Sequence, residues 1–216
     1  MYKGIIFDLD GTLLDTIETI AYYGNKTLGE YGFEPIETKK YNFMAGNGAK
    51  HLVKSMLAAS GVEDEELFER VFKDYNIAYH TDALYKTKVF DGINELISEA
   101  KNRGMKLAVL SNKPHAATVD VIEHFFEKGT FDLCFGAREG IPLKPDPEPA
   151  LAVAKELGLA CGECIYVGDT DVDMKTGKGA GFYTVGVLWG FRERQELEEH
   201  GADMIISKPT DILKLF

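Results

Sequence analysis

The fold is decided close to the start of the chain, in Lys3-Gly4-Ile5-Ile6-Phe7-Asp8-Leu9-Asp10-Gly11-Thr12-Leu13-Leu14-Asp15. The apolar residues 5–7 predict a central strand covered on both faces, and α/β sheets present their ligands at the carboxyl ends of such strands. Gly11 lets the backbone leave strand geometry, so that Asp8 and Asp10 can serve one site. Two carboxylates at such a short distance repel each other, and a bound cation usually offsets this repulsion. The stretch therefore predicts a cation-binding strand end, with a plain polar turn as the alternative.

The composition is that of a globular protein. A chain of 216 residues fits one α/β domain, or a core with a small insert. Asp+Glu 35 outnumber Lys+Arg 24, and the net charge of −11 disfavours nucleic acid or an anionic membrane as partner. No stretch approaches the ~18 consecutive apolar residues that span a membrane, and we see no secretion signal. We expect a cytoplasmic protein, whose oligomeric state the sequence leaves open.

The three cysteines, Cys134, Cys161 and Cys164, do not make a disulfide framework. The spacing of Cys161 and Cys164 is that of a redox pair, but such a pair opens a helix after a strand. Here the pair precedes a predicted strand, and no second pair completes a zinc site. We interpret these cysteines as incidental, with a redox role as the open alternative.

Helical periodicity dominates the chain directly after the aspartate turn. Helices are predicted over residues 17–28, 49–59 and 64–79, and no convincing strand falls among them. A crossover between parallel strands usually needs only one helix. We therefore predict an all-helical cap at residues 15–85, inserted after the first strand, and an α/β catalytic core made of residues 1–14 and 86–216.

The rest of the chain alternates between helices and strands. This order implies a doubly wound, mostly parallel sheet with helices on both faces. The predicted strands are 106–110, 131–135, 164–167, 183–187 and 204–206. The predicted helices are 93–103, 115–126, 147–157, 171–180 and 192–200, followed by a short C-terminal helix.

Polar residues follow four of the predicted strands at their carboxyl ends. Because these ends lie at one edge of a parallel sheet, the four clusters are expected to form a single site. An aspartate there can attack phosphorus, and water can hydrolyse the resulting acyl-phosphate. Mg²⁺ takes oxygen ligands, for which Asp8 and Asp169 are the natural carboxylates. Ser111, Lys144 and backbone amides can donate to phosphoryl oxygens, and a second acid can carry the proton. The clusters are Asp8 and Asp10; Ser111, Asn112 and Lys113; Lys144; and Asp169, Asp171 and Asp173.

The four clusters resemble, in order, the four motifs of the haloacid dehalogenase superfamily. The matching segments are Asp8-Leu-Asp10-Gly-Thr12, Ser111-Asn112-Lys113, Lys144-Pro-Asp-Pro and Gly168-Asp169-Thr-Asp-Val-Asp173. Dehalogenase members lack an aspartate at the position of Asp10, so the resemblance implies a phosphatase.

The resemblance also implies a role for each residue. Asp8 would be the nucleophile and a Mg²⁺ ligand, and Asp10 the general acid/base, its backbone carbonyl also on the metal. Asp169 would complete the metal site, supported by Thr12 and Asp173. Ser111 and Lys144 would hold the phosphoryl group, while Asn112 would donate to it or hold the turn; the motif does not demand Lys113.

The helical insertion resembles the subfamily with a cap between the first two motifs. Within it, the segment Phe43-Met44-Ala45-Gly46-Asn47-Gly48 is similar to phosphoglycolate phosphatases. This implies a small phosphorylated substrate, 2-phosphoglycolate first, and makes Gly46, Asn47, Gly48 and Lys50 candidates for specificity. A simple turn before a helix is the alternative reading of the glycines.

Several other functions stay open at this point. The same core could serve pyrophosphate, a sugar phosphate or a nucleotide, or act as a phosphomutase resembling β-phosphoglucomutase. A phosphate-binding protein without turnover is the remote alternative. Binding of phosphate without turnover does not require a second acid, so the presence of Asp10 argues against a phosphate-binding protein.

Overall fold

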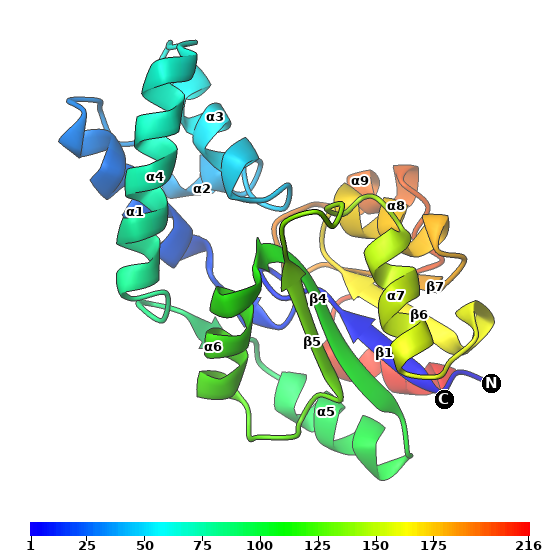
Figure 1. Ribbon diagram of the computed structural model, residues 1–216. Coiled ribbons are helices and arrows are strands. Elements are labelled where there is room, and N and C mark those ends of the chain that lie inside the picture. The colour runs from blue at the N-terminus through cyan, green and yellow to red at the C-terminus, as the bar shows by residue number, and fades with distance from the viewer. The chain divides into compact units, whose positions relative to one another are not determined.

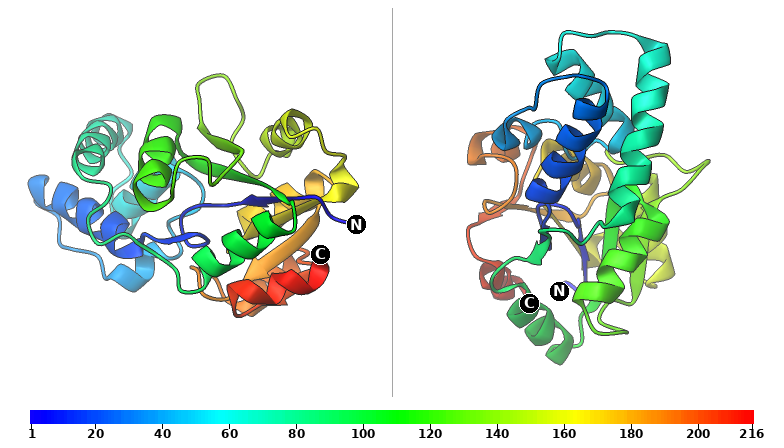
Figure 2. Two further views of the ribbon diagram at one scale, coloured as in Figure 1. Left: turned by 90° about the horizontal axis from the view of Figure 1, so that it is seen from below. Right: turned by 90° about the vertical axis from the view of Figure 1, so that its left-hand side faces the viewer.

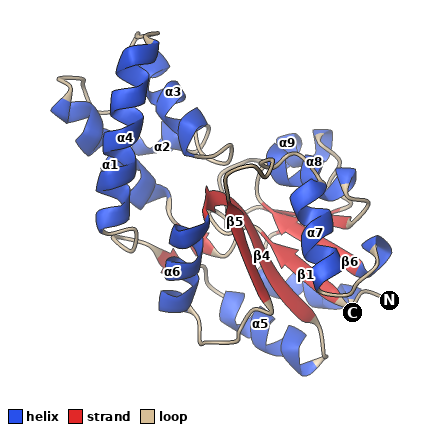
Figure 3. Cartoon of the chain, viewed as in Figure 1, coloured by secondary structure: helices blue, strands red, loops and turns tan.

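The computed structural model describes all residues, 1–216, and the chain divides into two compact units. Met1–Asp15 and Val89–Phe216 form the first, here called the α/β unit, and Thr16–Lys88 form the second, here called the helical insert. The strands of the large sheet belong to the α/β unit, whereas the insert is built of helices (Figures 1 and 3). None of the helices combines the length and the apolar character that crossing a membrane requires.

The α/β unit is built on a six-stranded sheet with the strand order β5-β4-β1-β6-β7-β8. Every pair of neighbours in it is parallel, which confirms the predicted fold class. β1 lies inside the sheet and all of its residues are buried, as its apolar run predicts. The strands are β1 (Gly4–Phe7), β4 (Lys106–Pro114), β5 (Leu133–Ala137), β6 (Cys164–Gly168), β7 (Tyr183–Val187) and β8 (Met204–Ile206).

Helices cover both faces of this sheet. α7 packs Ala150, Val153 and Ala154 against the face that carries Ile6 and Tyr166. α5 and the 3₁₀ segment η2 pack against each other on the opposite face (Figure 2, left). The helical elements of this unit are α5 (Ile93–Asn102), α6 (His115–Phe125), α7 (Glu148–Glu156), η1 (Cys161–Glu163), α8 (Asp171–Gly179), α9 (Arg194–Glu199) and η2 (Pro209–Leu215).

The helical insert has a core of its own. Apolar residues on α1, α3 and α4 are completely buried, among them Leu28, Val53 and Val71. The Asp64 carboxylate accepts the N–H of Leu67 at 2.8 Å and so caps α4. The helices are α1 (Ile17–Glu30), α2 (Thr38–Tyr41), α3 (Ala49–Ala59) and α4 (Glu65–Thr81).

The structure differs from the sequence prediction in four local features. β4 continues to Pro114, because after a register shift it pairs with β5 again at Ala137. The one-turn helix α2 is too short to show a helical period, and the C-terminal helix is 3₁₀ rather than α. Two strands of two residues each, β2 (Leu14–Asp15) and β3 (Lys88–Val89), form a second sheet.

Candidate active site

The register of the three central strands brings the predicted motifs to one edge. Phe7 of β1 is aligned with Val109 of β4 and with Val167 of β6. The next residue, Asp8, donates its backbone N–H to the Val167 carbonyl at 2.9 Å. The key residues of the second and fourth motifs, Ser111 and Asp169, each come two positions after these aligned residues. They lie at the same edge of the sheet as Asp8, because neighbouring parallel strands end at a common edge.

Lys144 joins two buried carboxylates. Its Nζ lies 2.8 Å from Asp8 Oδ1 and 2.7 Å from Asp173 Oδ1. Lys144 is 3% exposed, Asp8 5% and Asp173 0%, so solvent does not screen these pairs. Burial opposes the charged ammonium, but Asp173 and Asp8 outweigh it and raise the pKa of Lys144 well above its ordinary value. A permanent positive charge is thus held against Asp8.

Asn112 holds the backbone of Lys144 from both sides. Its Nδ2 donates to the Lys144 carbonyl at 3.0 Å, and its Oδ1 accepts the Lys144 N–H at 2.9 Å. The loop that carries Lys144 has no regular structure of its own, so these two bonds anchor it to β4. Of the two tasks expected for Asn112, these contacts describe the holding of the chain.

Asp173 supports two segments at once. While its Oδ1 accepts from Lys144, its Oδ2 accepts the backbone N–H of Thr170 at 3.1 Å and the Thr170 hydroxyl at 2.8 Å. These bonds close a capping box at the start of α8. A Cβ on Gly168 would lie 2.2 Å from Asp173 Cβ, so only glycine fits there. The carboxylate is therefore fixed by its own helix as well as by Lys144.

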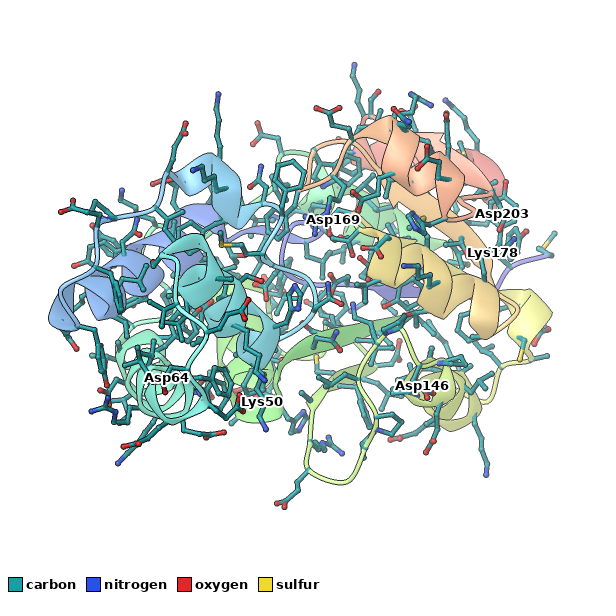
Figure 4. The ribbon with its side chains drawn as sticks, turned by 90° about the horizontal axis from the view of Figure 1, so that it is seen from above. Lys50, Asp64, Asp146, Asp169, Lys178 and Asp203 are labelled. Carbon is teal, nitrogen blue, oxygen red and sulfur yellow. The ribbon has the colours of Figure 1, made fainter.

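Asp169 is held on both of its oxygens. The Thr12 hydroxyl donates to Oδ1 at 3.0 Å, and the backbone N–H of Phe191 donates to Oδ2 at 2.8 Å. Asp169 is 0% exposed and lies inside the α/β unit among packed side chains (Figure 4). Gly11 adopts φ +89°, and a Cβ on it would lie 2.3 Å from Asp169 Oδ2. Glycine is thus required at position 11 of the first motif, because Asp169 of the fourth motif approaches it closely.

The buried carboxylates fit a divalent cation. Asp8, Asp169 and Asp173 each offer an oxygen within 4.8 Å of the others. Three carboxylates and the single ammonium of Lys144 leave about two negative charges in a buried place. Burial and the Asp173 charge raise the pKa of Asp8 to about 7, and the same two causes raise that of Asp169. A cation with two positive charges and a preference for oxygen, such as Mg²⁺, would relieve this repulsion.

The Asp10 carboxylate pairs with the ammonium of Lys113. Lys113 Nζ lies 3.1 Å from Asp10 Oδ1 and 3.3 Å from Oδ2. The Asp10 side chain is 20% exposed and that of Lys113 only 5%. The backbone N–H of Lys113 also donates to Ser111 Oγ at 3.2 Å. Lys113, to which we assigned no role from the sequence, thus belongs to the site. Its position two residues after Ser111, at the end of a strand, was the sequence signal that could have indicated this.

The loop after β7 is a further part of the site that sequence reasoning missed. Besides the Phe191 bond to Asp169, Trp189 Nε1 donates to the Thr12 carbonyl at 3.0 Å. A Cβ on Gly190 would lie 2.3 Å from Asp169 Cβ and 2.4 Å from the Gly11 carbonyl. The only tryptophan of the chain, followed by glycine at a strand's carboxyl end, was the signal that could have found it.

The predicted specificity residues lie in the helical insert. Gly46 and Gly48 adopt φ +108° and +84°, and Asn47 between them completes a turn before α3. Lys50 is in the first turn of α3 (Figure 4). Its Nζ lies 5.8 Å from the centre of the Phe72 ring, a cation–π contact. The glycines are therefore needed for the turn itself, and their task toward a substrate stays a prediction.

The cysteine pair lies at the start of a strand rather than at the start of an α-helix, where a redox pair is found. Cys161, Cys164 and Cys134 are free thiols. Cys161 begins the short 3₁₀ segment η1 and Cys164 begins β6. Burial raises the pKa of Cys164 to about 11, which disfavours the reactive thiolate. These observations support the reading of the cysteines as incidental.

Comparisons with known proteins agree with the geometry. A family model described as haloacid dehalogenase-like hydrolase matches residues 5–187. The chain is 33% identical to a phosphoglycolate phosphatase of Aquifex aeolicus, over 98% of this chain and 95% of the relative. It is 26% identical to an N-acetylmuramic acid 6-phosphate phosphatase of Pseudomonas aeruginosa, over 98% of this chain and 93% of the relative.

A solved structure is similar over the whole chain. The crystal structure of a proposed phosphoglycolate phosphatase from Lactobacillus delbrueckii subsp. bulgaricus has a TM-score of 0.94 at 29% identity, covering 99% of this chain and 98% of that one. Sequence, motif geometry and fold thus agree over the full length. The chain belongs to the haloacid dehalogenase-like hydrolases and is a phosphatase-like member of that family.

Proposed function

We propose that this enzyme is a Mg²⁺-dependent phosphomonoester hydrolase that acts on a small phosphorylated metabolite, 2-phosphoglycolate first, through a phosphorylated Asp8. One observation carries the proposal. Asp8 is buried at the end of β1 against the permanent charge of Lys144, and a second acid, Asp10, follows two residues later with its own cation. A site that only binds phosphate needs neither a buried carboxylate beside the phosphate nor a proton carrier.

The reaction follows from these two acids. A lone pair of the Asp8 carboxylate attacks phosphorus, the bond from phosphorus to the substrate alkoxide breaks, and Asp10 in its acid form gives the alkoxide its proton. Water then attacks the phosphorus of the acyl-phosphate and gives a proton to the Asp10 carboxylate. The bond from phosphorus to Asp8 breaks, which releases inorganic phosphate and restores both residues.

The remaining core residues bind and position. Lys144 and the Ser111 hydroxyl would donate to phosphoryl oxygens, and Asn112 would keep Lys144 in place. The oxygens of Asp8, Asp169 and Asp173, with the Asp10 carbonyl, would hold Mg²⁺. When bound, the ion supplies positive charge for the phosphoryl oxygens. Thr12 orients Asp169, and Asp173 orients Lys144.

The helical insert would choose the substrate. The turn Gly46-Asn47-Gly48 and Lys50 would carry out this task, with the Lys50 ammonium binding a carboxylate of the substrate. The relative from Aquifex aeolicus supports 2-phosphoglycolate as the first substrate to test. The relative from Pseudomonas aeruginosa favours a second candidate, a sugar-acid phosphate, at lower identity. Both candidates carry a carboxylate in addition to the phosphate ester.

The test is release of phosphate from a panel of phosphorylated metabolites by the purified chain with Mg²⁺. We expect the highest kcat/KM for 2-phosphoglycolate, loss of activity with a chelator, and no turnover by Asp8→Asn. Asp171→Asn is the matched control, because it makes the same change at an aspartate of the fourth motif that pairs with Lys175 on the surface of α8. A preference for pyrophosphate would overturn the substrate, and substantial activity of Asp8→Asn would overturn the nucleophile.

A further inference from the structure

Three segments that are distant in sequence meet around Asp169. They are the turn after β1, the end of β6 and the loop after β7. The loop after β7 makes two separate contacts, from the Phe191 N–H to Asp169 Oδ2 at 2.8 Å and from Trp189 Nε1 to the Thr12 carbonyl at 3.0 Å. Neither residue belongs to the motifs from which the site was predicted.

The contacts form a chain of hydrogen bonds that ends on the metal site. Trp189 holds the carbonyl of Thr12, and the hydroxyl of the same Thr12 holds Asp169 Oδ1 at 3.0 Å. Thr12 is completely buried, so its carbonyl would have little access to water without the indole. The glycines on each side, Gly11 and Gly190, leave no space in which the segments could shift.

Each Asp169 oxygen accepts one bond, which leaves lone pairs free for a cation and fixes the orientation of the carboxylate. Groups that orient metal ligands typically affect metal affinity by ~10- to 100-fold when they are removed. The indole acts one step further out, through Thr12, so its effect should be smaller and should depend on the Thr12 hydroxyl.

From this geometry we infer that Trp189 is a positioning residue of the metal site, which acts on Asp169 through Thr12. The inference rests on the proposed function, because it requires that Asp169 binds the divalent cation. It gives the loop after β7 a task in catalysis, although no residue of that loop is a predicted ligand or acid.

The experiment is titration of the purified chain with Mg²⁺ by calorimetry, without substrate. We expect Trp189→Phe, which keeps an aromatic ring but lacks the N–H, to bind Mg²⁺ about 3- to 10-fold more weakly, and Thr12→Val about 10-fold or more. In the double variant, the fold-loss of Mg²⁺ affinity should be clearly smaller than the product of the fold-losses of the two single variants. The reason is that both residues act on the same carboxylate, that of Asp169. The Mg²⁺ concentration needed for half-maximal turnover should shift in the same way, while KM for substrate stays unchanged.

The matched control is Tyr31→Phe, which also removes one aromatic donor, here to Asp74 at 2.7 Å within the helical insert. It should leave Mg²⁺ affinity unchanged. Unaltered affinity in Trp189→Phe, or losses that multiply in the double variant, would overturn the inference. Asp169→Asn separates the two hypotheses: if it binds Mg²⁺ like the wild type, the metal site itself is wrong.

Fluorescence of the unchanged protein provides a test that does not depend on a stable variant. Trp189 is the only tryptophan, so its emission reports this loop alone. We expect the Trp189 emission of the wild type to change on addition of Mg²⁺ and to saturate, with the same Kd as in calorimetry. In Asp169→Asn, the emission should not change. Emission that does not respond to Mg²⁺ bound by calorimetry would contradict the coupling.

Discussion

Lys113 contacts both carboxylate oxygens of Asp10, with its Nζ 3.1 Å from Oδ1 and 3.3 Å from Oδ2. The two residues are 103 positions apart in the sequence and meet because β1 and β4 are neighbours in the sheet. Without Lys113, the Asp10 carboxylate would add to the negative charge of the carboxylates of Asp8, Asp169 and Asp173. The pair thus orients the proposed proton carrier and balances its charge.

Replacement of Lys113 should affect turnover more than metal binding. We expect Lys113→Met to lower kcat about 10- to 100-fold, because Asp10 loses the group that orients it for proton transfer. Mg²⁺ affinity should change by less than about 3-fold, since Lys113 contacts the side chain of Asp10, whereas the proposed metal contact of Asp10 is its backbone carbonyl. Lys101→Met is the control, because Lys101 is an exposed lysine bonded to the Gly129 carbonyl. Steady-state kinetics and calorimetry together check this, and an unchanged kcat would contradict the role.

Asn112 offers a way to weaken phosphate binding through the backbone of Lys144. Asn112→Ala removes both bonds that hold the Lys144 backbone, so Lys144 should lose its fixed place against Asp8. We expect kcat/KM to fall about 10-fold or more, with weaker inhibition by inorganic phosphate. Asn102→Ala, at the exposed end of α5, should have no effect. Normal phosphate inhibition in Asn112→Ala would show that the Lys144 loop does not depend on this amide.

Gly11 and Gly104 form a matched pair for separating backbone strain from close approach. Both have positive φ, +89° and +75°, but only a Cβ on Gly11 would collide with Asp169, whereas the space at Gly104 is open. Alanine should cost each position about 1–2 kcal/mol of stability through the backbone. Only Gly11→Ala should also weaken Mg²⁺ binding, by about 10-fold or more. Denaturant unfolding and calorimetry measure the two effects, and equal Mg²⁺ affinity in both variants would refute the predicted clash.

Removal of the metal should make the stability of the protein depend on pH between about 4 and 7. The folded pKa of Asp8 is raised from 3.8 to about 7, so over this range the folded state holds a proton that the unfolded state has released. The free energy of unfolding in a chelator should therefore fall as the pH rises from about 4 to about 7, by on the order of a few kcal/mol, and then level off.

Thermal unfolding at a series of pH values tests this expectation. The free energy of unfolding should fall less steeply with pH in Asp8→Asn, because the amide cannot ionise. It should also fall less steeply in the wild type with Mg²⁺, because the ion favours the ionised carboxylate. The raised pKa of Asp169 acts in the same direction, so some dependence on pH should persist in the variant. Identical slopes for the wild type and Asp8→Asn in chelator would contradict the raised pKa.

Much of the fold could be predicted because its signals are local. The apolar run before Asp8 indicates a buried strand, and helical periodicity followed by glycine marks most helices. The alternation of helices and strands then implies a parallel sheet, whose common edge gathers the four motifs. Single-turn elements such as α2 escaped prediction, since one turn contains no full apolar period.

The chemistry at the strand ends can be read from the order of residues along the chain: it shows which carboxylates, lysines and hydroxyls are present and which strands they follow. Which of these groups touch depends on the tertiary fold. It paired Lys113 with Asp10, gave Asn112 the backbone of Lys144, and brought Trp189 to Thr12. These partners are 32 to 177 residues apart, and their distance in space is set by strand order, register and packing rather than by any local pattern.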